Sequence, residues 1–184
     1  MVSKGLDFDR VKVVGILNAD TAMNIPDFRS YERAYQMMSQ VAGRAGRRST
    51  QGIVILQPSQ PESELIDQVV RNDYSAMYKA QMQERQLFMF PPYCRLIYAF
   101  IRNRFANRAD DAARSLCCKL QPVFGDNMLG PASPPVARVK LEYIRQVMLK
   151  VPPTASPVKV REFLRRCAEE VRREYRVNIY FDAD

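Results

Sequence analysis

Two short runs of β-branched and other apolar residues set the strongest limit on how this chain folds. The first, VKVVGILNAD, spans residues 11–20, and the second, GIVILQ, spans residues 52–57. Continuous apolar runs of this length are typical of strands buried on both faces of a parallel sheet. Between them, residues 31–46 place apolar side chains at helical spacing, which predicts a helix. Strand, helix and strand predict a piece of an α/β sheet, with too few elements to bury both of its faces.

The next stretch predicts an arm between two domains. Residues 62–88 contain neither glycine nor proline and have the pattern of two amphipathic helices. The prolines of FPPYCR, residues 90–95, end this helical stretch, because a proline stops a helix at the preceding residue. We therefore divide the chain into an α/β part over residues 1–58, a helical connecting arm over 59–92, and a separate α+β domain over 93–184.

The pattern changes after this boundary. A strand is predicted over 95–103, a helix over 108–124, a short strand over 127–135, two strands over 136–152 bent near Glu142 and Tyr143, a helix over 156–175 and a last strand over 177–184. The last helix is expected to begin with Ser156 as its N-cap. For Tyr93, Tyr98, Phe100 and Tyr143 we favour packing in the core over stacking on bases. The order β-α-β-β-α-β predicts a ferredoxin-like α+β domain with its helices on one sheet face.

Charge is unevenly distributed along the chain. The net charge is +8, and 17 of the 28 Lys and Arg residues fall in residues 93–184, against 10 of the 20 Asp and Glu residues. A basic domain of this kind is typical of proteins that bind polyanions. A solvated surface with a bias in sign explains the same numbers.

Metal binding and membrane insertion are not expected for this chain. It has four cysteines, none spaced as C-x-x-C, and no histidine, so no metal site is predicted within it. No apolar run approaches the roughly 20 residues that span a bilayer. The N-terminal residues lack the apolar stretch of a signal peptide. We expect a cytoplasmic protein with free thiols and no membrane association.

The stretch QVAGRAGRRS, residues 40–49, places glycines beside arginines in a way that a simple helix does not favour. Gly43 and Gly46 each cost about 1 kcal/mol relative to alanine within a helix. Glycines beside Arg44 and Arg47 indicate that the backbone here must be free to change conformation or must come close to another group. The neighbouring arginine side chains are always positively charged.

The stretch matches Q-x-x-G-R-x-G-R, the last signature motif of superfamily 2 helicases, and VSKGLDF lies upstream where the preceding motif belongs. The longer run LNADTAMNIPDFRSYERAYQMMSQVAGRAGR, with FPPYCR, GPA and VMLKVP farther on, resembles the primosomal protein N′ family of bacterial replication-restart helicases. The resemblance covers essentially the whole chain. It implies that residues 1–58 are the end of the second RecA-like helicase lobe and that the family's 3′-to-5′ DNA helicase activity restarts stalled forks by loading the primosome.

The resemblance also assigns roles to residues of the motif region. It implies that Arg47 is an arginine finger at the phosphates of ATP, with Arg44 beside it and Gln40 orienting groups in the same cleft. Gly5, Asp7 and Gly43 are expected at the nucleotide. Ser3 and Lys4 are expected at the DNA backbone.

The chain lacks parts that ATP hydrolysis needs. It contains no G-x-x-x-x-G-K-[ST] phosphate loop and no acidic D-E-x-H motif to hold Mg²⁺. The resemblance implies that these belong to a first lobe, and that zinc-binding cysteines also precede this region. ATP and Mg²⁺, and zinc as well, are therefore expected in the full-length protein, while this fragment is expected to be inactive.

For the C-terminal domain the resemblance implies binding of branched and single-stranded DNA, contact with other primosome proteins, and docking of the acidic tail of single-stranded DNA-binding protein. The candidate peptide site is Lys159, Arg161 and Arg165, near the start of the last helix, where anions are favoured. Val158 and Phe163 are expected to receive the apolar end of the tail. Candidate phosphate contacts are Arg138, Lys140 and Arg145.

Other interpretations remain open from the sequence. The arginines of the last helix are also spaced to form ion pairs with Glu162, Glu169, Glu170 and Glu174. The fragment taken alone fits a non-enzymatic module that binds nucleic acid or protein. A ribosomal or RNA-binding α+β domain agrees with the charge, although the motif at 40–47 argues against it.

Overall fold

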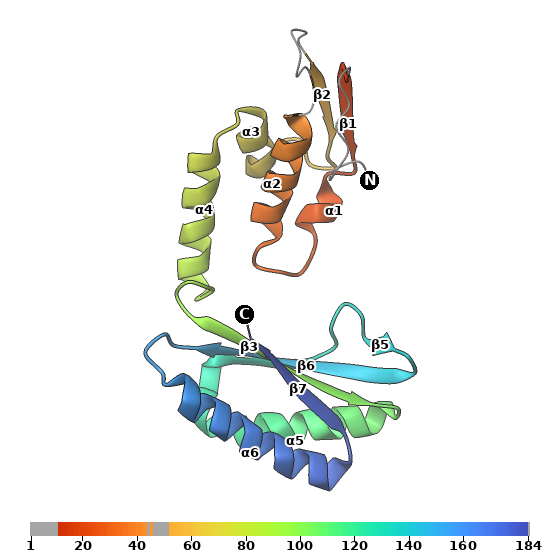
Figure 1. Ribbon diagram of the computed structural model, residues 1–184, viewed down its shortest axis with the longest axis vertical. Coiled ribbons are helices and arrows are strands. Elements are labelled where there is room, and N and C mark those ends of the chain that lie inside the picture. Colours follow the sequence, from red (N-terminus) through yellow and green to blue (C-terminus); the bar gives the residue numbers. More distant parts are fainter. Residues whose placement is uncertain (1–10, 44, 46–51, 184) are drawn as a thin grey trace. The chain divides into compact units, whose positions relative to one another are not determined.

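The computed structural model describes residues 11–43, 45 and 52–183 of the chain (Figure 1). The chain divides into two compact units, Met1–Leu87 and Phe88–Asp184. Residues 59–92, predicted as a connecting arm, contribute their two helices to the first unit, and residues 88–92 begin the second. Within the described residues, no helix is both long and apolar enough to cross a membrane.

The first unit is built on a parallel strand pair. Strand β1 (Val13–Leu17) and strand β2 (Ile53–Gln57) pair in parallel register from Val13↔Ile53 to Leu17↔Gln57. They are connected through α1 (Asp20–Met23) and α2 (Ser30–Ala42). The predicted strand, helix and strand are therefore present. The four-residue helix α1 was not predicted, because a helix of this length is too short to show an apolar pattern at helical spacing.

One face of the strand pair carries the helices and the core of this unit. Helices α3 (Glu64–Val70) and α4 (Tyr74–Leu87) pack with α2 around buried apolar side chains. Ala34 and Met38 of α2 are fully buried, and Leu65 and Met77 from the two later helices are at most 3% exposed. Three tyrosines of α2 and α4 also cluster here, with Tyr74 ring centroids 6.1 Å from Tyr35 and 6.2 Å from Tyr78.

The other face of the same strand pair is exposed and apolar. Val13, Leu17, Ile53 and Ile55 are each more than half exposed, and Leu17 reaches 77%. Parallel sheets are normally covered on both faces, so this exposed face is unusual for a complete α/β sheet.

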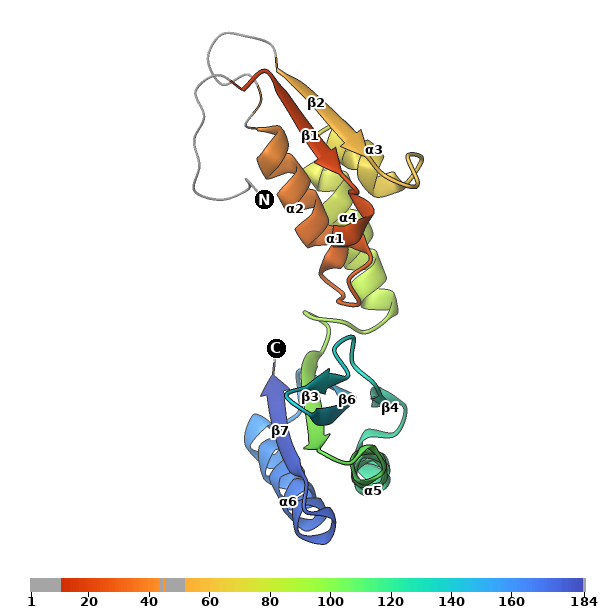
Figure 2. The same cartoon turned by 90° about the vertical axis from the view of Figure 1, so that its right-hand side faces the viewer.

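The second unit is a mixed α+β domain with a single antiparallel sheet. The strands lie in the order β4-β6-β3-β7, and the short β5 pairs with β6. Their bounds are β3 Arg95–Asn103, β4 Met128–Ala132, β5 Arg138–Val139, β6 Glu142–Val151 and β7 Asn178–Ala183. Helices α5 (Ala106–Phe124) and α6 (Pro157–Tyr175) both cover one face of this sheet, as Figures 1 and 2 show. A short 3-10 turn, η1 (Gly125–Asn127), joins α5 to β4.

The core of this unit lies between the sheet and its two helices. Fully buried side chains include Ile101 and Val147 from the sheet, Leu116 and Leu120 from α5, and Val171 from α6. The apolar positions recur at helical spacing along α5 and α6, which explains why the sequence indicated these helices correctly. Ser156 is the N-cap residue of α6, but its side chain makes no capping hydrogen bond.

The sheet face away from the helices carries a row of aromatic side chains. Ala99 and Ile101 face the core, so their neighbours Tyr98 and Phe100 project to the opposite face. The Phe100 ring lies 6.2 Å from that of Tyr98 and 5.0 Å from that of Tyr180, and Arg102 covers Tyr180 at 4.8 Å. Tyr98 and Phe100 are thus half-buried members of this row and lie outside the helix-side core to which we had assigned them.

Candidate functional site

The clearest site is a pocket in the second unit, between the first half of α6 and the sheet. Its volume is about 380 Å³. Its floor is apolar, formed by Ile97 of β3, Val151 of β6, Leu164 of α6 and Phe181 of β7. Amphipathic α6 creates this geometry, because its apolar stripe packs on the sheet while the residues beside that stripe border the opening.

Four arginines line the same pocket and play two different parts. Arg95 donates hydrogen bonds from Nη2 to the backbone oxygens of Pro152 (3.3 Å) and Ala155, and Arg172 donates from Nη2 to the backbone oxygen of Ile179. These two side chains hold the β6–α6 connection and β7 in place. Arg161 and Arg165 are exposed, lie four residues apart on α6, and make no ion pair within the described residues. An apolar floor beside two available guanidinium groups fits a ligand with an anionic and an apolar part.

The structure brings together two of the three residues predicted for peptide binding. Arg161 and Arg165 line the pocket, whereas Lys159 is exposed outside the lining. Of the apolar residues, Val160 lines the pocket, while Val158 is 61% exposed elsewhere. Phe163 packs against the core, 6.3 Å from the ring of Phe124, and does not line the pocket.

The alternative ion pairs within α6 are not formed by the pocket arginines in the part of the chain that is described. Glu170 pairs instead with Lys119 of α5 at 2.7 Å, which lowers the pKa of Glu170 and raises that of Lys119.

The three residues predicted for phosphate contact differ in availability. Arg138 and Lys140 are exposed on the β5–β6 hairpin, and the Arg138 guanidinium lies 5.0 Å from the Tyr143 ring centroid. Arg145 forms a two-point pair with Asp110 of α5, with Nε–Oδ1 at 2.5 Å and Nη2–Oδ2 at 3.0 Å. This hydrogen bonding lowers the pKa of Asp110 and raises that of Arg145. Arg145 must give up this pair in order to reach a phosphate.

Most of the residues predicted at the nucleotide and at the DNA backbone lie outside the described residues: Ser3, Lys4, Gly5, Asp7, Arg44 and Arg47. Gln40 is exposed in the last turn of α2, and Gly43 caps the end of that helix. Gly43 has φ −65°, and a Cβ there would meet only ordinary contacts. Its own backbone conformation therefore does not require glycine, and close approach of a ligand stays a prediction.

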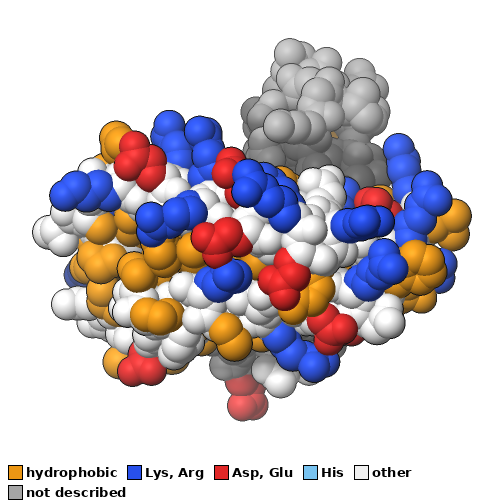
Figure 3. Space-filling model, turned by 90° about the horizontal axis from the view of Figure 1, so that it is seen from below, with side chains coloured by type: hydrophobic (Ala, Val, Ile, Leu, Met, Phe, Trp, Pro, Cys, Tyr) orange, Lys and Arg blue, Asp and Glu red, His pale blue; other side chains and the backbone are white. Residues whose placement is uncertain are grey.

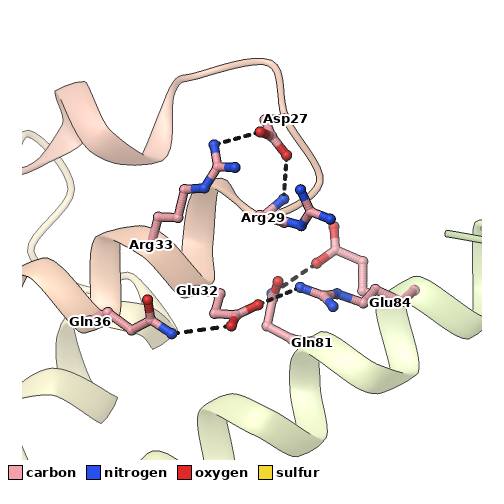
Figure 4. Close-up of polar contacts among 8 residues, drawn as sticks. Asp27, Arg29, Glu32, Arg33, Gln36, Gln81 and Glu84 are labelled. Atoms are coloured by element: carbon pink, nitrogen blue, oxygen red, sulfur yellow. Dashed lines mark hydrogen bonds and ion pairs between the residues drawn. The ribbon is translucent and has the colours of Figure 1, made fainter. Parts of the chain in front are cut away.

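The NIPDFRSYER stretch has a structural role that the sequence did not indicate. Asp27 accepts hydrogen bonds from the Arg29 backbone nitrogen (2.9 Å) and from Arg33 Nη1 (2.6 Å), as Figure 4 shows. Glu32 of α2 pairs with Arg85 of α4 at 2.6 Å, and the Arg85 side chain is only 15% exposed. The pair therefore fastens α2 to α4. Its partners lie 53 residues apart, so no local pattern reveals it.

The described residues also bear on metal binding. Within residues 11–43, 45 and 52–183, no three His, Cys, Asp or Glu side chains lie together in a way that holds a metal ion. Cys94, Cys117, Cys118 and Cys167 are free thiols. Burial raises the pKa of Cys117 to about 11, which makes this thiol a poor nucleophile at neutral pH.

Comparison with known proteins identifies the class to which the second unit belongs. Residues 86–184 match the family model described as "Primosomal protein N C-terminal domain". The unit is therefore a C-terminal domain of the primosomal type, and the chain belongs to the primosomal protein N family.

Similar curated proteins carry the name "Replication restart protein PriA". The protein of Treponema pallidum is 36% identical over 100% of this chain and 28% of its own length. The protein of Bacillus subtilis is 35% identical over 95% of this chain and 22% of its own length, and that of Haemophilus influenzae is 31% identical over 100% and 25%. The chain thus spans roughly a quarter of the length of these relatives.

Proposed function

We propose that this chain is the C-terminal part of an ATP-dependent 3′-to-5′ DNA helicase that restarts stalled replication forks by loading the primosome. Family membership and the Q-x-x-G-R-x-G-R motif at residues 40–47 support this function. ATP and Mg²⁺ act, in this proposal, in a longer protein that supplies the phosphate loop, and zinc binds outside this chain. The 184-residue chain itself serves as a DNA- and protein-binding module in the cytoplasm and does not hydrolyse ATP alone.

The proposal includes the fold of both units. Residues 1–58 are the end of a RecA-like lobe, which is supported by the parallel β1–β2 pair and its exposed apolar face. Further elements of the lobe would cover that face. The second unit is ferredoxin-like, which is supported by the order β4-β6-β3-β7 and by two helices on one face.

The proposed partner of the second unit is the acidic, apolar-ended tail of single-stranded DNA-binding protein. The pocket beneath Arg161 and Arg165 is the observation that carries this proposal, because it combines available positive charge with an apolar floor. Carboxylates of the tail pair with the two guanidinium groups, and its terminal apolar side chain enters beside Val160 and Phe181. A short peptide buries little area and loses conformational freedom on binding, so the affinity is expected to be modest.

The test is a fluorescence-anisotropy titration of the 184-residue chain with a labelled acidic peptide that ends in a phenylalanine carboxylate. Reversing both charges, Arg161→Glu with Arg165→Glu, should weaken binding at least tenfold, which corresponds to about 1.4 kcal/mol. The matched control is Arg166→Glu with Arg173→Glu, which makes the same charge change on exposed positions of α6 outside the pocket lining. Arg172 is unsuitable as a control because it holds the backbone of Ile179.

Two further measurements distinguish binding of the peptide in this pocket from attraction by the net positive charge of the chain. Val160→Asp should weaken binding, because it places a charge in the path of the apolar side chain. Added salt should weaken binding without abolishing it, since the apolar contribution remains. Equal losses for the pocket pair and the control pair would mean that net charge alone attracts the peptide, and the site would be wrong.

A further inference from the structure

The two edges of the sheet in the second unit differ in how they are closed to further strands. An edge strand offers a row of backbone N–H and C=O groups that can pair with another extended chain. At one edge, β4 contains Pro131, which has no N–H, and the register of β4 on β6 shifts between Leu129 and Ala132. Proline and irregular register are features that keep further strands from pairing. The β4 edge is therefore closed.

Strand β7 forms the other edge and lacks these features. It pairs with β3 in continuous antiparallel register over Asn178–Ala183, and within the described residues no strand lies on its other side. The strand contains neither proline nor lysine. Because Phe181 packs against the core on the helix side, the neighbouring Asp182 lies on the sheet face away from α6. The edge of β7 is thus regular and suited to pairing with another strand.

The second half of β7 is the part of this edge that is open. The backbone groups that point away from β3 belong to every second residue of the strand. Arg172 of α6 donates from Nη2 to the backbone oxygen of Ile179, so a side chain already supplies a partner near the start of β7. In the part of the chain that is described, no element other than β3 bonds to the backbone of residues 180–183.

This open half leads directly into the pocket beside α6. Ala183 lies opposite Ile97 of β3, and both residues line the pocket together with Phe181. Among the described residues, the lining includes four arginines and no Asp or Glu. Figure 3 views the molecule from the side on which α5 and α6 lie in Figure 1 and shows Lys and Arg side chains spread over this face. The open strand edge therefore ends at an apolar floor in basic surroundings.

We propose that the backbone of residues 180–183, which we call the β7 edge, binds an acidic, extended peptide as an added strand. The apolar C-terminal residue of the peptide enters the pocket at the end of this edge. Binding by strand addition gains affinity from main-chain hydrogen bonds and specificity from pockets for side chains. The inference rests on the proposed function, which supplies an acidic partner with an apolar end. It adds pairing of the two backbones and the direction of the peptide.

The direction follows from the position of the pocket. The pocket lies at the C-terminal end of β7, so a peptide whose last residue enters it runs from the Asn178 side toward Ala183. The peptide and β7 are therefore parallel. At about 3.3 Å per residue, the β7 edge accommodates roughly four peptide residues before the apolar end. Every second peptide side chain then lies on the helix side of the sheet, where Arg161 and Arg165 are exposed.

Charge favours an acidic peptide over a second copy of this chain. Two copies paired through their β7 edges would bring two α6 helices with the same arginines alongside each other, and like charges repel. An acidic peptide instead places carboxylates beside Arg161 and Arg165, where charge-assisted hydrogen bonds form. DNA has no peptide backbone and cannot join a β-sheet.

The first test compares two N-methylated forms of an acidic peptide that ends in a phenylalanine carboxylate, by fluorescence anisotropy with the 184-residue chain. One form is methylated on the first and third residues before the phenylalanine, and the other on the second and fourth. Only every second peptide amide points at β7. One form should therefore bind at least about tenfold more weakly than the unmodified peptide and the other less than about threefold, because each lost hydrogen bond costs roughly fivefold. The two forms have the same charge and the same end, so each is the control for the other.

The second test locates the peptide by amide hydrogen exchange and NMR. With the unmodified peptide bound, every second amide of residues 180–183 should exchange at least about tenfold more slowly, because its N–H gains a partner. Amides of Leu129 and Ala132 on the β4 edge are the matched control and should not change. A nitroxide at the N-terminal end of the peptide should broaden the amide signal of Ile179 more than that of Ala183.

The outcomes separate this inference from the function on which it rests. Suppose that the peptide binds, and that Arg161→Glu with Arg165→Glu weakens its binding. Equal losses for the two methylated forms, or unchanged exchange of the β7 amides, would then overturn strand addition and leave the proposed function standing. Stronger broadening at Ala183 would overturn the parallel direction. Slower exchange on raising the protein concentration alone would make a second copy the occupant of the edge. Absence of peptide binding would overturn both the inference and the proposed partner.

Discussion

Gly130 lies where two strand backbones come closest in the second unit, and replacing it by alanine should destabilise this unit strongly. It sits in β4 with φ +121°, between Leu129 and Ala132, where the register of β4 on β6 shifts. A Cβ at this position would lie 2.9 Å from the backbone oxygen of Gln146 and 3.3 Å from the Cα of Val147. Both atoms belong to the backbone of β6, which cannot move aside as a flexible side chain can.

Two penalties contribute to the expected cost. A non-glycine residue in this region of φ costs on the order of 1–3 kcal/mol. Forcing an extra carbon into a packed contact costs a further ~1–3 kcal/mol. Gly130→Ala should therefore lower the free energy of unfolding by roughly 2–6 kcal/mol, a large part of the 5–15 kcal/mol that typical domains have.

Gly125→Ala is the matched control for the contact. Gly125 also has positive φ, +50°, but a Cβ there would meet nothing within 4 Å. It should show only the backbone penalty of about 1–3 kcal/mol. The difference between the two variants therefore measures the close approach of β4 to β6.

Native-state hydrogen exchange of the 184-residue chain measures the stability of each unit separately. The slowest amides of β3 and β6 should exchange roughly 30- to 20,000-fold faster in Gly130→Ala, since each 1.4 kcal/mol is a factor of ten. Amides of α2 in the first unit should not change, because the glycine lies in the other unit. A loss below about 0.5 kcal/mol would refute the reasoning from the close approach.

Two other substitutions test electrostatics and catalysis. Because Arg145 holds the pKa of Asp110 below its usual value, this carboxylate stabilises the fold above its unfolded pKa, near 3.9, and the contribution is lost as pH falls through the folded value. Urea unfolding should show Asp110→Asn less stable than the natural chain by about 1–2 kcal/mol at pH 7, and the gap should shrink at pH 3; a constant gap would contradict this. In a longer chain that carries the phosphate loop, Arg47→Ala should cut DNA-stimulated ATP hydrolysis by several powers of ten with nucleotide binding largely kept. Natural turnover in that variant would remove Arg47 from the mechanism.

Local patterns predicted the elements of the second unit closely. Strand 95–103 has the predicted bounds, and the helix predicted over 156–175 is observed as Pro157–Tyr175. Both have strong periodicity and clear ends. The hairpin turn was misplaced, because Lys140 and Leu141 carry none of the glycine, asparagine or proline signals that mark turns in a sequence.

The sites were harder to predict because they depend on contacts between distant segments. Arg161 and Arg165 were proposed from their position near the start of one helix, but the apolar floor beneath them comes from β3, β6 and β7. From the sequence Arg145 was predicted to be an available cation, whereas in the structure it pairs with Asp110, 35 residues earlier in the chain.

The row of rings on the open face of the sheet gives the chain a spectroscopic label of its own. The sequence contains no tryptophan, so tyrosine dominates its near-ultraviolet absorption and circular dichroism. Tyr98 and Tyr180 flank Phe100 in the second unit, while Tyr35, Tyr74 and Tyr78 form the separate cluster of the first. Near-ultraviolet dichroism reports fixed aromatic packing. The part of the signal that is lost when Tyr98 and Tyr180 are changed to phenylalanine therefore reports the packing of this row without any attached dye.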